Sequence, residues 1–323
     1  MKRAIVLLLV NSFCVTLFAG NVRFTEQFAT HIPAQADLDI RWIAPTSGLP
    51  ASIWVYHLSP RKLSHEIISN LMVACSFTAK DGTTNGDLVI FKSGDRELRL
   101  SWPWGIIDYN TLQDYSITNI VKNVPSTNEV VKLAKQFLPK LGIPIADIAK
   151  AENSSQPEFY PAEMGGTDFI GTNAIHKIDS CEVHFSRVVD GIEFVSIGTG
   201  GEGEIKFGGG GKVVRILITW RNMERAKQYA TFTPETMIKL IRGGKAIQGG
   251  VSERFGEIDW RKFKSVTIKE ITPLYYAGGD RYAPTDWLKP YARLWTTVET
   301  DHGSVDVEMD TPIIDDVKAG DAK

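Results

Sequence analysis

The chain has 323 residues, of which 43% are hydrophobic and 23% are charged, and its formal net charge is −2. This is the composition of an ordinary globular protein, and the length favours two or three domains. So small a net charge creates no field that would attract nucleic acid or an acidic membrane surface, so we expect neither as a partner.

The first 20 residues have the order of a secretory signal peptide. Lys2 and Arg3 form a positive start, an interrupted apolar run follows, and Ala19–Gly20 suit a cleavage site. A membrane-spanning helix needs about 20 apolar residues in a row, and no such run follows. A lipid anchor would need a cysteine at position 21, which is Asn21. We therefore expect an extracytoplasmic protein, periplasmic or secreted, with no membrane span after cleavage.

Two cysteines remain after the signal peptide, Cys75 and Cys181. An oxidising compartment would permit a disulfide between them. The bridge would close a loop of roughly 100 residues and contribute about 4 to 5 kcal/mol in chain-entropy estimates. The alternative is two separate buried thiols, since Cys75 falls on the apolar side of an expected helix.

Three helices are expected from caps and from apolar residues at helical spacing. Each begins with a Ser or Thr cap and either a proline or a glutamate at capping-box spacing: Ser59 with Pro60, Ser126 with Glu129, and Thr233 with Pro234. Glycines at 142 and 243 end the second and third helices.

Between these helices, apolar residues alternate with polar ones, which predicts strands. The clearest hairpin turns at Asp190–Gly191, because an Asp-Gly pair suits a tight turn. Further hairpins are expected over 204–220 and 292–309, and a strand over 38–42. Residues 143–175 are rich in proline and glycine, and we expect them to be mostly a connecting segment.

Helix followed by antiparallel strands, three times over, predicts an α+β protein of tandem modules, each with one helix packed on an antiparallel sheet. The expected divisions are a signal peptide (1–20), an N-terminal module (21–124), a middle module (125–232), a C-terminal module (233–314) and a flexible tail (315–323).

Motifs that would mark a cofactor or a metal each lack a required feature. Gly198, Gly200 and Gly203 match G-x-G-x-x-G, but a strand follows instead of the helix that a dinucleotide site requires. His65 begins a zinc-binding pattern, but Ser69 stands where the second histidine is needed. We therefore expect no cofactor, no metal ion and no catalytic residues.

Asp306, Glu308 and Asp310 alternate with apolar residues on the last expected strand. One interpretation is the solvated face of a half-exposed strand. The other is an acidic strip that meets a cation or a basic partner.

Several short runs together suggest a family. A strand from Val183 turns at Asp190–Gly191, and after a glycine-rich bend comes Thr219-Trp220-Arg221. These are followed by Thr-Pro-Glu at 233–235, Leu274-Tyr275-Tyr276 and Leu288-Lys289-Pro290-Tyr291. Over about residues 126–310 the pattern resembles exported bacterial proteins of the PepSY type and the YycI-type regulators. Both are similar to the propeptide domains of secreted peptidases.

The resemblance implies PepSY- or cystatin-like modules of one helix on a sheet. It also implies inhibition or chaperoning of a peptidase, or modulation of an envelope sensor, with no catalytic residues. We therefore expect an exported non-catalytic protein that binds or regulates an envelope or secreted protein. The alternative is a hydrolase or glycan-binding protein whose site combines scattered Asp, Glu and Trp residues.

Overall fold

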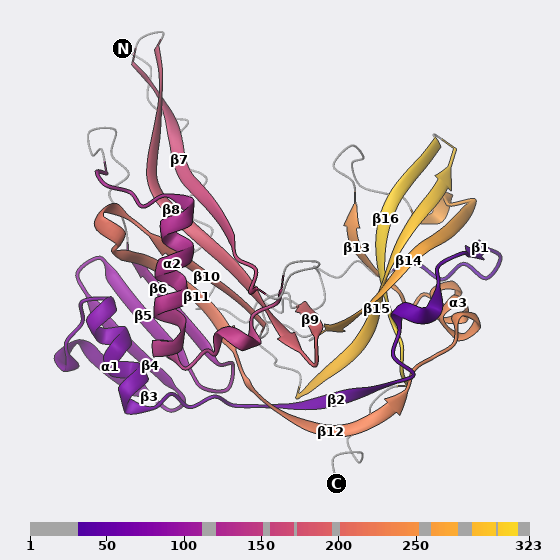
Figure 1. Cartoon of the computed structure of the whole chain (residues 1–323), viewed down its shortest axis with the longest axis horizontal. Coiled ribbons are helices and arrows are strands. Elements are labelled where there is room, and N and C mark those ends of the chain that lie inside the picture. Colours follow the sequence, from indigo (N-terminus) through magenta and orange to yellow (C-terminus); the bar gives the residue numbers. More distant parts are fainter. Residues whose placement is uncertain are drawn as a thin grey trace.

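The computed structural model describes residues 32–111, 121–150, 156–170, 173–195, 201–251, 260–276, 286–301 and 303–315. The expected signal peptide (1–20) lies outside these residues, as does most of the expected tail. Within the described chain, strands predominate: sixteen of them form one mixed sheet, and three α-helices accompany it (Figure 1).

Two groups of elements surround two hydrophobic cores, and we call them the helical lobe and the C-terminal lobe. The helical lobe contains α1 (His65–Ala74), α2 (Thr127–Phe137), β3 (Gly82–Asn85), β4 (Leu88–Ser93), β5 (Arg96–Ser101), β6 (Ile106–Thr111), β7 (Tyr160–Ile170), β8 (Asn173–Val189), β10 (Gly201–Phe207) and β11 (Val213–Trp220). The C-terminal lobe contains β1 (Asp39–Trp42), β2 (Ser52–Ser59), β9 (Ile192–Val195), β12 (Asn222–Ala230), α3 (Pro234–Arg242), β13 (Ile247–Val251), β14 (Ser265–Tyr276), β15 (Trp287–Thr300) and β16 (Gly303–Pro312).

The predicted α+β fold of tandem modules is wrong. The sheet runs in the order β12-β2-β15-β14-β9-β8-β10-β11-β6-β5-β4-β3, so strands from distant parts of the sequence pair with one another. β1 and β9 both pair in parallel with β14, which makes the sheet mixed. The prediction relied on the order of elements along the chain, and this order carries no information about pairing between distant strands.

Three segments of the described chain cross between the lobes, and together we call them the joint (Figure 1). Residues 58–63 lead from Leu58 in the C-terminal core to Leu63 in the helical core. Residues 185–189 of β8 make the same passage, as do residues 220–223, which run from the end of β11 to the start of β12. Within the described residues, continuous backbone therefore ties the two cores together at three places.

Several local predictions are confirmed. α2 begins with the Ser126–Glu129 capping box, and the turn after it ends at Gly142, whose φ is 68°. α3 begins at the Thr233 cap. The β8–β9 hairpin turns at Asp190–Gly191, where both residues have a positive φ, as a type I′ turn requires. The expected hairpins over 204–220 and 292–309 also form.

The start of the first helix was predicted wrongly. Ser59 ends β2, and α1 begins after Ser64, whose hydroxyl accepts a hydrogen bond from the N–H of Ile67 at 3.3 Å. The backbone N–H of Arg61 instead donates to Trp102 at 2.8 Å. This contact holds the chain after Pro60 in a non-helical conformation, although the sequence suits a helix start.

The interpretation of residues 143–175 as mostly a connecting segment is also wrong, because β7 and the start of β8 lie there. Gly165 explains the error. A Cβ at this position would come within 1.8 Å of the carbonyl oxygen of Lys177, so only glycine permits this close pairing at the bulge. The glycines mark a tight strand pair here.

Candidate binding site at the joint

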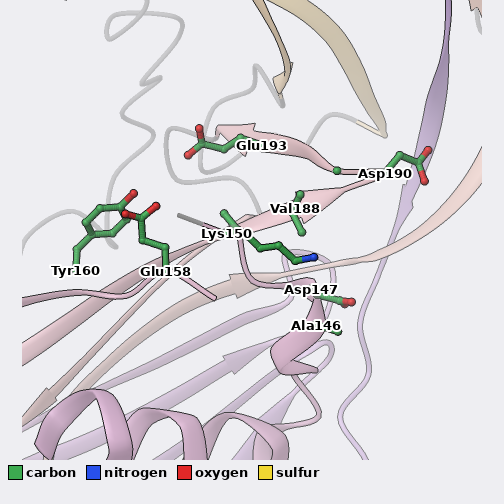
Figure 2. A pocket seen from close by; sticks show the side chains of 10 residues that line it. Ala146, Asp147, Lys150, Glu158, Tyr160, Val188, Asp190 and Glu193 are labelled. Carbon is green, nitrogen blue, oxygen red and sulfur yellow. The ribbon is translucent and has the colours of Figure 1, made fainter. Parts of the chain in front are cut away.

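A hollow of about 400 Å³ opens beside the joint (Figure 2). Three separate segments line it: a 3₁₀ turn at Ile145–Asp147 with the residues after it, the start of β7, and the β8–β9 turn. Its lining residues are Ala146, Asp147, Ala149, Lys150, Glu158, Tyr160, Val188, Asp190, Gly191 and Glu193. Four of these are carboxylates and one is a lysine, so the hollow is acidic.

Tyr160 and Glu158 form one wall of the hollow, and Figure 2 shows their polar ends side by side. Tyr160 is 53% exposed, which is unusual for a large aromatic side chain. Partial burial, together with the hydrogen bond to Glu158, raises the pKa of Tyr160 to about 12. The phenol therefore remains protonated at neutral pH, where it donates to the carboxylate.

Asp190, on the opposite wall, is held by the C-terminal lobe. Arg225 of β12 donates to it at 2.6 Å, and the hydroxyl of Tyr56 on β2 donates to its other carboxylate oxygen. Burial and the hydrogen bond to Asp190 raise the pKa of Tyr56 to about 12. Asp190 thus fixes the turn to its neighbours. Among the described residues, Glu193 on the same wall accepts a 3.3 Å bond from Ser186, and its charge acts on Arg293.

The joint beneath the hollow contains three buried arginines, one on each crossing segment. Arg61 and Arg187 are each 8% exposed, and Arg221 is 2% exposed. Asp147 connects this cluster with the hollow, because its carboxylate lines the hollow and lies 3.9 Å from Nη2 of Arg187.

The two cysteines considered for a disulfide, Cys75 and Cys181, do not line the hollow. Cys75, which caps the end of α1, and Cys181, on β8, are both buried in the core of the helical lobe, and both are free thiols. Burial raises the pKa of Cys75 to about 12 and also raises that of Cys181. The thiolate form that reacts with oxidants is therefore scarce at neutral pH.

The three carboxylates of the predicted acidic strip all lie on β16, do not line the hollow, and all contact residues of their own chain. Asp310 is 4% exposed and accepts two hydrogen bonds from Arg293, at 3.0 and 3.1 Å. Glu308 lies 3.5 Å from the same guanidinium. Asp306 accepts a 2.5 Å bond from Thr297 and pairs with Lys269 at 3.5 Å.

Of the glycine motif, Gly203 lies in β10, whereas Gly198 and Gly200 fall outside the described residues. A Cβ at Gly203 would come within 2.0 Å of the Phe185 ring, so this glycine makes room for a core aromatic side chain. Its role is packing.

The sequence reasoning missed the hollow. Its lining comes from three segments, and two of them lie in the stretch that was interpreted as a connecting segment. The one available signal was the Asp190–Gly191 turn, which was identified as a turn but not as part of a site.

No family model matches the sequence, and no curated protein is similar to it. The resemblance to PepSY-type proteins therefore remains a hypothesis. No helix in the described part of the chain is long and apolar enough to cross a membrane. The same residues contain no group of three His, Cys, Asp or Glu side chains placed to hold a metal ion.

Proposed function

We propose that this chain is an exported, non-catalytic protein that binds and regulates an envelope or secreted protein, and that it does so through the acidic hollow at the joint. The observation that carries this proposal is the lining of the hollow, which combines four carboxylates with a half-exposed tyrosine. The segment before β7 and the turn after β8 place these groups around one concave surface.

This chemistry suits a lysine or arginine side chain of a partner protein. Carboxylates form charge-assisted hydrogen bonds with ammonium and guanidinium groups. The ring of Tyr160 offers a face on which a cation can lie. Glu158 and Glu193 are the carboxylates best placed to meet the partner, because Asp190 is already held by Tyr56 and Arg225.

A binding measurement with synthetic peptides tests the proposal. A lysine- and arginine-rich peptide should bind the purified protein, and a peptide of the same length rich in Asp and Glu should not. The affinity should fall as salt is added, because screening weakens contacts between exposed charges. Equal affinity for the two peptides would contradict the proposal.

Peptide binding by two variants identifies which surface of the protein is used. Glu158→Gln combined with Glu193→Gln should weaken the basic peptide about tenfold or more, since each lost charge-assisted contact contributes about 1.5 to 3 kcal/mol. Asp39→Asn is the control: it also removes a negative charge, but from an exposed pair with Arg41 on β1. If the control weakens binding as much as the double variant, only net charge matters and the hollow is not the site.

Glycan binding is a second candidate, and a specific residue favours it. Trp295 on β15 is 45% exposed, and Glu270 and Glu308 lie directly across from it on the neighbouring strands. A flat aromatic face beside carboxylates can stack on a sugar ring and accept its hydrogen bonds. Titration with soluble cell-wall glycans, followed by tryptophan fluorescence of the wild type and of Trp295→Ala, would detect this activity. An unchanged wild-type signal would reject it.

A further inference from the structure

Arg61 and Arg187 of the joint have few partners for their charge. Arg61 donates to the main-chain carbonyl oxygens of Leu141 and Gly142, and Arg187 donates to that of Arg221. The carboxylate of Asp147 lies 3.9 Å from Nη2 of Arg187, which is longer than a hydrogen bond. These two guanidinium groups therefore bring more buried positive charge than Asp147 offsets.

Arg61 and Arg187 each have a nitrogen whose N–H finds no hydrogen-bond partner among the described residues: Nη1 of Arg61 and Nε of Arg187. Both nitrogens are buried from solvent. A buried donor without an acceptor costs about 1 to 3 kcal/mol, and more when it carries charge. Native proteins rarely leave such groups unsatisfied, and an ion or an ordered water molecule often accounts for the exceptions.

The electrostatics of the cluster agree with a shortage of negative charge. Burial lowers the pKa of Arg61 to about 10, and burial together with the charge of Arg61 lowers the pKa of Arg187 to about 10, against the attraction of Asp147. The ring of Trp220 lies 4.8 Å from the Arg187 guanidinium and covers it with an aromatic face. The ring supplies attraction for a cation, but it does not supply an acceptor for the Nε N–H.

We propose that a small inorganic anion binds against the guanidinium groups of Arg61 and Arg187 and accepts their two unpartnered N–H groups. An oxyanion suits this position, because guanidinium forks and tetrahedral oxyanions match in geometry and in charge. Water could accept the same hydrogen bonds, but it would leave the excess positive charge in place. Since Arg61 and Arg187 belong to different crossing segments, the anion joins two of the three segments of the joint.

Phosphate is the probe for a stability measurement on the purified protein. The protein is first exchanged into a buffer whose only anion is bulky and organic, at constant ionic strength, and urea unfolding is then followed as phosphate is added. A ligand that binds only the folded state stabilises it by mass action, so above the Kd each tenfold rise in phosphate raises the folding equilibrium constant about tenfold. General salt effects act at much higher concentrations.

Variants locate the effect. Arg61→Met and Arg187→Met keep most of the side-chain volume but remove the charge, and each should abolish the dependence on phosphate. Arg41→Gln is the control, because Arg41 belongs to an exposed pair and its loss should leave the dependence unchanged. A dependence that persists in both methionine variants would place the anion elsewhere and overturn the proposal.

A calorimetric titration keeps the test decisive if a variant does not fold. Wild-type protein in the anion-free buffer should bind about one phosphate per chain, with a Kd in the range where stability responds. The absence of both phosphate binding and a response in stability would mean that water satisfies these N–H groups, and the proposal would fail.

Discussion

Two arginine sites in this molecule differ in how the guanidinium charge is compensated: Arg293, which is 23% exposed, and the buried pair Arg61 and Arg187. In the C-terminal lobe, Arg293 meets Asp310 through two hydrogen bonds. Although burial lowers its pKa, the hydrogen bonds and charge of Asp310 raise the pKa of Arg293 above its ordinary value. At the joint, Arg61 and Arg187 have no comparable carboxylate, and burial lowers the pKa of both to about 10. The charge of Arg293 is therefore paired within the chain. Arg61 and Arg187 instead have buried N–H groups that a bound ligand can accept.

The largest effect should follow the loss of the Arg293 partner. Asp310→Ala leaves a partly exposed guanidinium without its bidentate carboxylate. Removing one member of a fully buried pair typically costs about 3 to 5 kcal/mol, so we expect a cost of about 2 to 3 kcal/mol at this partly solvated site. Urea unfolding should show this loss of unfolding free energy. A cost below about 1 kcal/mol would mean that Glu308, 3.5 Å from Arg293, compensates for the missing partner. The difference between Arg293 and the joint arginines would then not depend on Asp310.

The joint should respond differently to the loss of a charge. In the anion-free buffer, Arg187→Met removes a buried cation whose nearest carboxylate is 3.9 Å away. An apolar side chain of similar volume removes the desolvation cost of a poorly compensated buried charge, so the substitution need not destabilise the protein. The same unfolding measurement should therefore give no loss, or a gain. A loss as large as that of Asp310→Ala would show that the joint arginine is already fully compensated.

The turn beside the hollow offers a test by pH. Tyr56 has its pKa raised to about 12, mainly by burial and then by its bond to Asp190, so the folded state holds its proton more tightly than the unfolded chain does. The stability from this bond is present below pH 10 and is lost as pH rises from about 10 to about 12. Tyr56→Phe should cost about 1 kcal/mol at neutral pH. Its difference from wild type should shrink across that alkaline range, and a constant difference would contradict this assignment.

The smallest effect should come from Asp306, on the same strand face as Asp310. Its side chain is 70% exposed, and its partner Lys269 is half-exposed at 3.5 Å. Exposed ion pairs contribute about 0 to 1 kcal/mol, and salt screens them. Asp306→Asn should therefore change the unfolding free energy by less than about 1 kcal/mol, and even less in high salt. A larger cost would show that solvent exposure does not explain the difference in stabilisation between Asp306 and Asp310.

Features that depend on neighbouring residues could be predicted from the sequence. The Ser126 cap, the left-handed Gly142 and the Asp190–Gly191 turn each follow from the conformational preferences of a few adjacent residues. Ser59 shows the limit of this reasoning: its local sequence suits a helix start, but a hydrogen bond from Arg61 to distant Trp102 prevents one.

The candidate site depends on contacts that no local pattern records. Glu158 and Glu193 meet at the hollow because β7 and β9 both lie against β8. Arg61 and Arg187 meet because two crossing segments pass through the same joint. Each of these arginines resembles an ordinary surface residue in the sequence, and only the pairing of distant strands buries it.

The pairing of the first strands with the last ones also limits when the protein can fold. Ile40 of β1 pairs with Val266, and Tyr56 of β2 pairs with Leu288. These pairs close loops of more than 200 residues, and folding rates fall as native contacts become more distant in sequence. The C-terminal lobe therefore cannot assemble until almost the whole chain has been made, so the newly synthesised protein remains unfolded for longer than a chain built from local modules.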